Sequence, residues 1–282
     1  MNGFGGDVLG TAFALGTAYA VVGVAVAMVA AATRTMFLAV GAIATAGLTA
    51  ALVLGVTDVT GVPGPVAFAV GVVGAGALAA ALGPFVLSRR GRVGWLIGFV
   101  VAAGVVEALV ARTVGARTIR PDPLLQVPGL GPVATAVAIG VPVALVAAWV
   151  VERSRWGHRV RIVGSSPASA EHAGWRVLGV RSTALAGAGG LATVAAALAA
   201  PVVALGPAQS AGLTVRGIAA AALLGRSSPA WALPGGLALG IAETVGQRAW
   251  PEAGGEVAVA VLVVGVLAIR GAESARGWGR AW

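Results

Sequence analysis

The chain contains no lysine and no cysteine, and histidine occurs only twice in its 282 residues. Without lysine there is no P-loop, no pyridoxal Schiff base and no lysine general base. Without cysteine there are no disulfides, thiolate nucleophiles or zinc ribbons, and two histidines without an HExxH pattern do not make a metal site. We therefore predict no catalytic, cofactor-binding or metal-binding residues in this chain, and we do not expect it to be an enzyme.

Charged residues are also scarce. They make up 10% of the chain, whereas hydrophobic residues make up 58%. A soluble domain carries about 25% charged residues, so the solvent of this chain must be lipid. The net charge of +9 then indicates membrane orientation rather than nucleic-acid binding. The low charge therefore predicts a multi-pass membrane protein, and the use of arginine in place of lysine with much alanine, glycine and valine indicates a GC-rich bacterial genome.

Nine apolar runs are candidates for membrane-spanning helices, each of which needs about 20 residues. They predict an all-α, polytopic transmembrane helical bundle of about 8–9 spans that forms a single domain over residues 1–282. The opening sequence MNGFGGD has no basic region, so the first run is expected to be a retained helix. The runs are Val8–Ala32, Thr35–Val56, Pro65–Leu87, Val93–Ala111, Pro132–Val151, Thr183–Ala204, Leu213–Leu224, Ala230–Val245 and Val257–Ile269.

The arginine-rich linkers set the expected orientation. Residues 89–92, residues 152–181 and the C-terminal tail are basic, and the positive-inside rule places them in the cytoplasm. The N-terminus is then outside and the C-terminus cytoplasmic, although residues 112–131, with three arginines, face outward in this arrangement. Leu213–Leu224 is short and contains Arg216; if it were re-entrant, the basic tail would face outward, so we predict a true crossing.

Glycine is abundant, with 44 residues. Stretches such as GVVGAG at 71–76 and GAGG at 187–190 lie within apolar runs. A dinucleotide-binding loop would need a flanking strand and a loop in water. Small residues allow close contact between helices in lipid, so we interpret these glycines as packing positions.

The cytoplasmic stretch 152–181 contains a short helix signal of its own. Pro167 suits a first helical turn, with Ser165 or Ser166 as the N-cap. Glu171 follows near the helix start, and Gly174 is suited to end the helix. Such a helix is either a docking element for a cytoplasmic partner or part of a basic interfacial loop, and these physical arguments leave both open.

The same stretch carries a family resemblance. Gly157-x3-Arg161, then Pro167 with Gly174 seven residues later, then a Gly/Ala-rich helix ending in Pro201, resembles the branched-chain amino-acid ABC transporter permease family. Matching segments are ALGTAYA at 14–20, Phe37-x3-Gly41-Ala42, Arg216 to Gly225, and Pro234-Gly-Gly-x3-Gly240-x2-Glu243. The resemblance runs from about residue 8 to residue 270. The sequence departs from it at Thr35, at Ala39–Val40 and at Gly225-Arg226.

The resemblance implies a multi-pass permease subunit in a bacterial inner membrane, part of an ABC importer for a small polar solute that is expected to be a branched-chain or related amino acid. It implies a second permease subunit, usually related but not identical, two cytoplasmic ATPase subunits that bind the ATP, and an extracytoplasmic binding protein. The cytoplasmic helix becomes the coupling helix that enters a groove of the ATPase. The residues expected to carry coupling are Gly157, Arg161, Pro167, Glu171 and Gly174. A permease for a sugar, urea or amide, and a non-transport membrane scaffold, are the alternatives.

Three charged residues fall within apolar runs: Glu107, Arg216 and Glu243. Each costs about 2.5–3.5 kcal/mol at a helix centre, so such residues usually face a partner or a water-filled cavity. We predict that they line or gate a translocation path, with Arg216 and Glu243 paired across neighbouring helices. The alternatives are a purely structural ion pair and, for Glu107, snorkelling to the helix end.

An intramembrane enzyme is the remaining alternative, because Gly225-Arg226-Ser227 resembles the GxS of an intramembrane serine protease. A nucleophilic serine needs a base within hydrogen-bond reach. Both histidines, His158 and His172, lie in the cytoplasmic stretch, so the sequence disfavours this interpretation.

Overall fold

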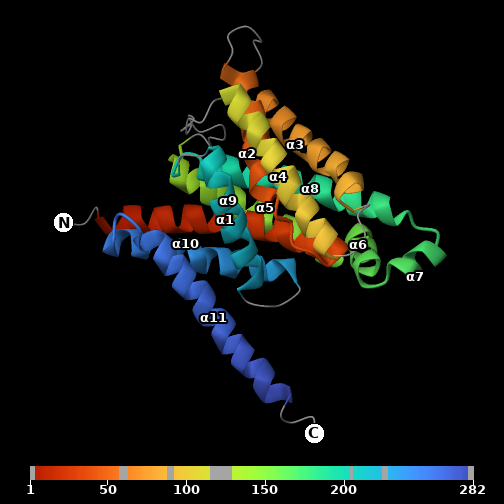
Figure 1. Cartoon of the computed structure of the whole chain (residues 1–282). Helices are drawn as coiled ribbons and strands as arrows, with labels where there is room; N and C mark the ends of the chain where they lie inside the picture. The colour runs from red at the N-terminus through yellow and green to blue at the C-terminus, as the bar shows by residue number, and fades with distance from the viewer. Residues whose placement is uncertain are drawn as a thin grey trace.

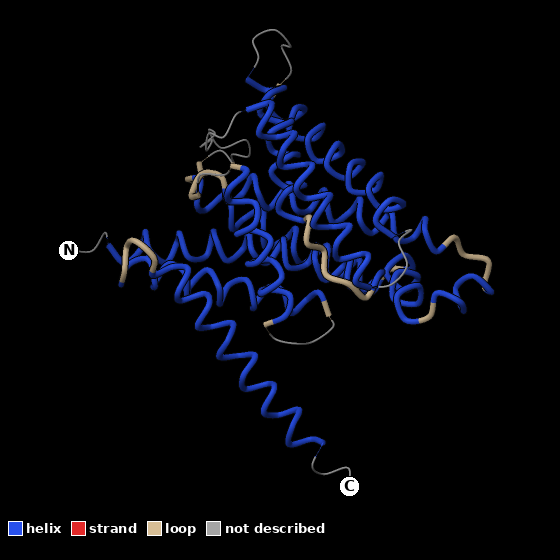
Figure 2. Tube along the Cα trace, in the orientation of Figure 1, coloured by secondary structure: helices blue, strands red, loops and turns tan. Residues whose placement is uncertain are grey.

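The computed structural model of the protein describes residues 4–56, 63–87, 92–114, 129–203, 206–223 and 228–278. This part of the chain is helical, with turns between the helices and no strand among the described residues (Figures 1 and 2). The helices are α1 (Phe4–Thr33), α2 (Val40–Val56), α3 (Gly64–Leu87), α4 (Arg92–Val114), α5 (Pro132–Arg153), α6 (Arg155–Ser165), α7 (Pro167–His172), α8 (Val177–Ala199), α9 (Pro207–Ala222), the 3-10 turn η1 (Pro229–Trp231), α10 (Ala232–Ala249) and α11 (Gly254–Trp278).

All nine predicted runs overlap helices, but three of the predicted starts are displaced by five or six residues. Helix α2 begins at Val40 rather than Thr35, because residues 34–39 form a bend and a turn. Helix α8 begins at Val177 rather than Thr183, and α9 begins at Pro207 rather than Leu213. Helices α8 and α9 start in polar sequence that an apolar-run criterion leaves out. Helix α6 was not predicted, because its arginines interrupt any apolar run and its buried face consists of small residues.

Five helices are long and apolar enough to cross a membrane, and two further apolar helices are shorter. The five are Val8–Thr33, Gly64–Leu87, Gly94–Thr113, Pro132–Arg153 and Val177–Ala199, and the shorter ones are Val40–Gly55 and Gly254–Val266. The all-helical class and a multi-pass membrane protein follow. The count of 8–9 spans and the direction of the termini stay predictions, and Arg89, Arg90 and Arg280 of the basic segments lie outside the described residues.

Helix α1 is the centre of the bundle, packed against α5, α8, α9 and α10. The membrane-length apolar part of α1 is 89% buried, whereas the corresponding parts of α4 and α5 are each 28% buried. The outer helices leave large apolar side chains exposed, among them Val100, Val105 and Val146. An outward apolar surface of this kind fits lipid. Helix α11 packs mainly on α10 and extends away from the body (Figure 1).

Glycine makes the closest of these helix contacts possible. A methyl group on Gly240 of α10 would overlap the Ala12 carbonyl and the Gly16 backbone of α1. Within the predicted packing stretches, an added Cβ on Gly76 would lie 2.9 Å from the Ala186 carbonyl, and one on Gly189 would lie 2.7 Å from the Ala75 carbonyl. The packing interpretation of these glycines is confirmed at these positions.

Candidate functional site

A bidentate ion pair joins α9 to α10. The Arg216 guanidinium donates from Nε to Glu243 Oε2 at 3.0 Å and from Nη2 to Glu243 Oε1 at 2.7 Å. The Glu243 side chain is only 3% exposed, whereas that of Arg216 is 20% exposed. The Arg216 guanidinium also lies 5.8 Å from the ring centroid of Tyr19 on α1, a cation–π distance. The predicted pairing of Arg216 with Glu243 is therefore confirmed as a contact.

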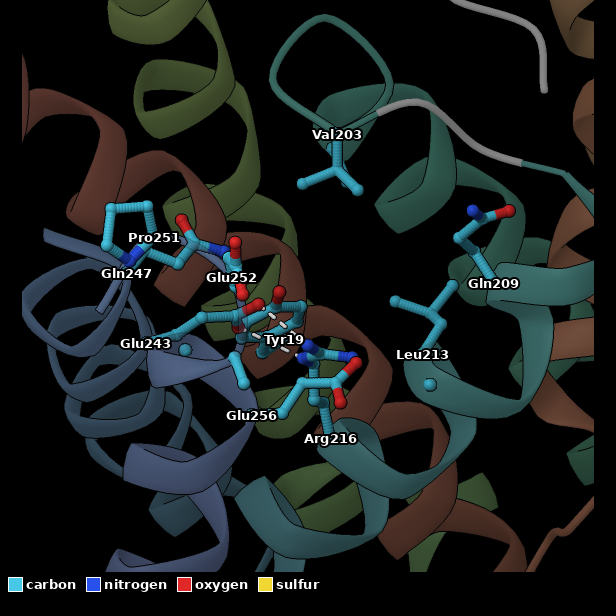
Figure 3. Close-up of a pocket in the computed structure, with 14 residues that line it drawn as sticks. Tyr19, Val203, Gln209, Leu213, Arg216, Glu243, Gln247, Pro251, Glu252 and Glu256 are labelled. Carbon is cyan, nitrogen blue, oxygen red and sulfur yellow. Dashed lines mark hydrogen bonds and ion pairs between the residues drawn. The ribbon is translucent and has the colours of Figure 1, made fainter.

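This pair lines a cavity of about 560 Å³, which we call the Glu243 cavity (Figure 3). Its wall comes from α1, the end of α8, α9, α10 and the turn that leads into α11, and its volume suits a small solute. The polar residues that line it are Tyr19, Gln209, Arg216, Glu243, Gln247, Glu252 and Glu256. Three carboxylates therefore face one guanidinium, and the cavity carries an excess of negative charge.

One polar atom of this cavity wall has no partner in the described part of the chain: Gln209 Oε1, which is buried. An unpaired buried polar atom costs about 1–3 kcal/mol. A bound solute or a water with a free donor would remove this cost.

A second cavity of about 470 Å³ lies farther along α1, and we call it the Arg34 cavity. It is lined by Val26, Ala27, Ala30 and Ala31 of α1, by Arg34, Thr35 and Met36, by Arg161 of α6, and by Ile218, Ala221 and Ala222 of α9. The Glu243 cavity touches α1 at Tyr19. The two cavities thus occupy different levels of the same helix.

Helix α9 crosses α1 (Figure 1), and the contact at Val22 and Gly23 of α1 lies between these two levels. A methyl group on Gly217 would overlap the Val22 side chain, and an added Cβ on Gly23 would lie 3.0 Å from the Cβ of Ala220. The backbones of α1 and α9 therefore touch with no room for a solute. The contact of α9 with α1 therefore lies between the Glu243 cavity and the Arg34 cavity.

The third intramembrane charge, Glu107, lies elsewhere. Its Oε1 accepts a hydrogen bond from the hydroxyl of Ser210, a buried residue on α9. Glu107 is not among the residues that line the Glu243 cavity. It attaches α4 to the N-terminal part of α9, so the structure does not bring it together with the ion pair.

Sequence reasoning missed several polar residues of α9. Thr214 Oγ1 accepts a hydrogen bond from the Gly41 amide of α2 at 3.0 Å, and Ser210 holds Glu107. Ser210 and Thr214 are four residues apart, hence on one face of the helix. Two polar residues four positions apart, at the start of an apolar run, could have indicated this polar face of α9 from the sequence.

The predicted cytoplasmic helix is present as α7. Pro167 opens it, the Ser166 hydroxyl accepts from the Ser169 amide at 3.4 Å, and Gly174 follows its end with φ +76°. Ala170 is buried against Val163 and Val177. Pro167, Glu171 and Gly174 are exposed and form a surface that a partner can reach.

The other two predicted coupling residues make contacts within the chain. Gly157 is buried, and a methyl group there would overlap the Val151 carbonyl of α5. The Arg161 guanidinium donates to the carbonyl of Val151 at 2.6 Å and to that of Glu152 at 3.0 Å. These two residues fix α6 against α5, so their predicted contact with an ATPase stays a prediction.

The segment α6–α8 is also attached to the last turn of α1. Arg34, which has φ +59°, donates from Nε to the Gly164 carbonyl at 3.2 Å. Arg181 of α8 donates from Nε to the Ala32 carbonyl at 3.3 Å, and its guanidinium lies 5.1 Å from the Trp95 ring centroid. The end of α1 is thereby linked to the segment that holds α7.

Ser227 and the neighbouring Gly225 and Arg226 lie outside the described residues. His158 and His172 are exposed on α6 and α7. The His172 ring Nδ1 lies 2.7 Å from the Ala168 carbonyl, four residues earlier in its own helix.

The described residues thus form a helical bundle with five membrane-length apolar helices and a charged cavity against its central helix. The family described as "Branched-chain amino acid transport system / permease component" matches residues 8–269. The chain therefore belongs to this family of ABC transporter permeases.

Comparison with solved structures identifies PsaBC from Streptococcus pneumoniae in complex with Fab. The two chains are 16% identical, with a TM-score of 0.53, and the match covers 94% of this chain and 89% of that chain. At this identity the likeness concerns the fold. No curated protein matches the sequence.

Proposed function

We propose that this permease is the membrane subunit of a bacterial importer for an amino acid, with a branched-chain or related side chain, and that α9 is the barrier in its path. The observation that carries the proposal is the pair of cavities on the two sides of the α1–α9 crossing. With the N-terminus outside, the Glu243 cavity opens outward and the Arg34 cavity opens inward.

The chemistry of the ion pair favours a zwitterion. To separate Arg216 from Glu243, a solute must replace both partners, because an unpaired buried carboxylate is costly. An amino acid has a carboxylate for Arg216 and an ammonium group for Glu243. A sugar, urea or amide has neither charge, and it would leave the pair closed.

The excess of negative charge supports the same class of solute. Glu252 lies on the turn that leads into α11, and Glu256 lies among the first residues of α11. Both side chains are exposed where the cavity opens. Carboxylates at a cavity mouth attract the cationic end of an approaching solute. The ammonium group would enter first toward Glu243, and the Gln209 carbonyl oxygen would accept one of its protons.

Coupling to ATP is proposed to pass from α7 to α1. The exposed residues Pro167, Glu171 and Gly174 would contact an ATPase subunit, because the chain has no nucleotide-binding lysine of its own. Arg34 and Arg181 connect this segment to the end of α1. A displacement of α7 would then be transmitted to α1, against which α9 packs.

Reconstituted transport tests the function. Proteoliposomes would contain this chain with a second permease subunit and two ATPase subunits, supplied with the binding protein and ATP. We expect ATP-dependent uptake of radiolabelled leucine or valine, and no uptake of glucose or urea. Uptake of an uncharged solute, with none of any amino acid, would overturn the proposed substrate.

Cysteine labelling tests the orientation, and the natural absence of cysteine leaves no background. In intact cells we expect a membrane-impermeant maleimide to label Gln247→Cys in the Glu243 cavity. Ala168→Cys on α7 should react only after the membrane is opened. Both residues are exposed in the bundle, so labelling of Ala168→Cys from outside would place α7 on the wrong side for an ATPase.

Substitutions on α7 test coupling. In the double variant Glu171→Arg/Gly174→Trp, we expect ATP hydrolysis to continue while uptake falls by roughly tenfold, which corresponds to about 1.4 kcal/mol of lost contact. Gly129→Trp is the matched control, because Gly129 also has a positive φ, of +84°, and open space around it. Equal uptake in the double variant and the control would mean that α7 is not the docking element.

A further inference from the structure

The corner between α5 and α6 carries an arginine-lined recess of about 370 Å³, which shares only Arg161 with the two cavities of the proposed transport path. The residues that line this arginine recess are Arg153, Ser154, Arg155, His158, Arg159, Arg161 and Trp175. Arg161 is occupied by the carbonyl groups of α5. Arg153, Arg155 and Arg159 are exposed, and none of them has a carboxylate partner in the described part of the chain.

The acidic residue nearest in sequence is turned away from the recess. Glu152 Oε1 accepts hydrogen bonds from the Ser228 hydroxyl and from the Ala230 amide, the latter at 3.2 Å. Its charge is therefore directed toward the start of α10. The recess keeps a positive excess, and a ligand that fills it must be an anion.

An apolar groove of about 610 Å³ lies beside the recess, between α5 and α8. We call it the Met28 groove, and its lining consists of Met28, Pro142, Val143, Val146, Ala147, Val150, Trp156, Thr183, Gly187 and Leu191. From Pro142 to Val150 it follows about 12 Å of α5, at 1.5 Å per residue. Val146 and the neighbouring Trp149 are about 60% exposed, so the groove opens toward lipid.

Groove and recess adjoin at one level of the molecule. Val150 and Trp156 belong to the groove, and Arg153 and Arg155 between them belong to the recess. The Trp156 indole donates from Nε1 to Thr183 Oγ1 at 3.2 Å, which holds the ring at this junction. The apolar span of α5 ends at Arg153, and tryptophan favours the headgroup level of a membrane, so the recess lies at the depth of lipid headgroups.

We propose that this corner is a binding site for an anionic phospholipid, with its phosphate in the arginine recess and one acyl chain in the Met28 groove. The recess alone would accept any phosphate or acidic group, and the groove alone would accept any lipid tail. Only a ligand with a negative head directly joined to an apolar chain fills both. Basic pockets beside membrane helices bind anionic lipid headgroups, because each nearby arginine attracts the negative charge of the headgroup. This proposal does not depend on the transported solute.

Native mass spectrometry of the full chain released from nanodiscs tests the proposal. The nanodiscs contain equal amounts of phosphatidylglycerol and phosphatidylcholine, and the readout is the ratio of the two lipids retained. We expect the wild-type chain to retain phosphatidylglycerol preferentially, and Arg153→Gln/Arg155→Gln to lose that preference by roughly tenfold or more. The control is Arg112→Gln/Arg248→Gln, which removes two exposed arginines outside the recess and should retain the lipid.

A second variant tests the tail. Ala147→Phe fills the Met28 groove without changing any charge, and we expect it to reduce retention of phosphatidylglycerol while the arginines remain. All variants are compared as monodisperse samples by size-exclusion chromatography. Unchanged retention in Ala147→Phe would mean that the recess binds phosphate without a lipid chain, and it would overturn the proposal. Unchanged retention in Arg153→Gln/Arg155→Gln would overturn it as well.

Discussion

Arg216→Ala is expected to abolish uptake and to destabilise the protein by about 3–5 kcal/mol, the usual cost of removing one partner of a buried ion pair. The cost is high because Glu243, which loses its guanidinium partner, is the more buried residue of the pair, at 3% exposure against 20% for Arg216. Glu243→Gln should cost less, since the amide still accepts a hydrogen bond and the remaining charge of Arg216 reaches the water of the cavity. Thermal unfolding and uptake in proteoliposomes measure both effects.

The double variant Arg216→Ala/Glu243→Gln separates a structural role from a transport role. Removing both charges should restore part of the stability lost in Arg216→Ala, because no buried charge is left unpaired. Uptake should remain absent, because the groups that bind the solute are gone. Arg248→Ala, an exposed arginine on the same helix as Glu243, is the control. Wild-type uptake in the double variant would reduce the ion pair to a structural element.

Gly240→Ala should prevent folding of the bundle, with a loss of more than about 3 kcal/mol, at or above the upper end of overpacking costs. The added methyl group meets the backbone of α1 at Ala12 and Gly16, and backbone at a helix crossing cannot turn aside as a side chain can. The measurement is the yield of monodisperse protein by fluorescence-detected size exclusion.

Gly74→Ala and Gly104→Ala are the matched controls for this effect. Each glycine lies inside an outer helix, and an added Cβ would have nothing within 4 Å. Alanine has the higher helix propensity, by about 1 kcal/mol, so these variants should fold at least as well as the wild-type chain. Loss of folded protein in the controls as well would show that glycine is needed for another reason than helix contact.

The sequence predicted the class of fold and the central ion pair for physical reasons. A chain with 10% charge cannot cover a soluble surface, and charges inside apolar runs need partners. Arg216 and Glu243 lie 27 residues apart on consecutive predicted runs, so their pairing followed from the cost of burial. The helix signal at Pro167 to Gly174 also predicted α7, because capping is local in sequence.

What could not be predicted depends on distant contacts or on helices without an apolar run. The partner of Glu107 is Ser210, 103 residues away, and nothing local selects it. Helix α6 was missed because its buried face contains Gly157, Val160 and Gly164 among exposed arginines. The first turns of α9 were missed because they are polar, although they hold residues that anchor the helix.

The connection between α1 and the α6–α8 segment has a consequence for how the sequence can vary among relatives. Arg34 and Arg181 both donate to backbone carbonyl groups, those of Gly164 and Ala32. Every residue type supplies a backbone carbonyl, so evolution can replace Ala32 with another small residue and keep the bond. Relatives should therefore conserve the two arginines, whereas the residue at position 32 should vary among small residues. An alignment of homologous sequences would reveal this pattern.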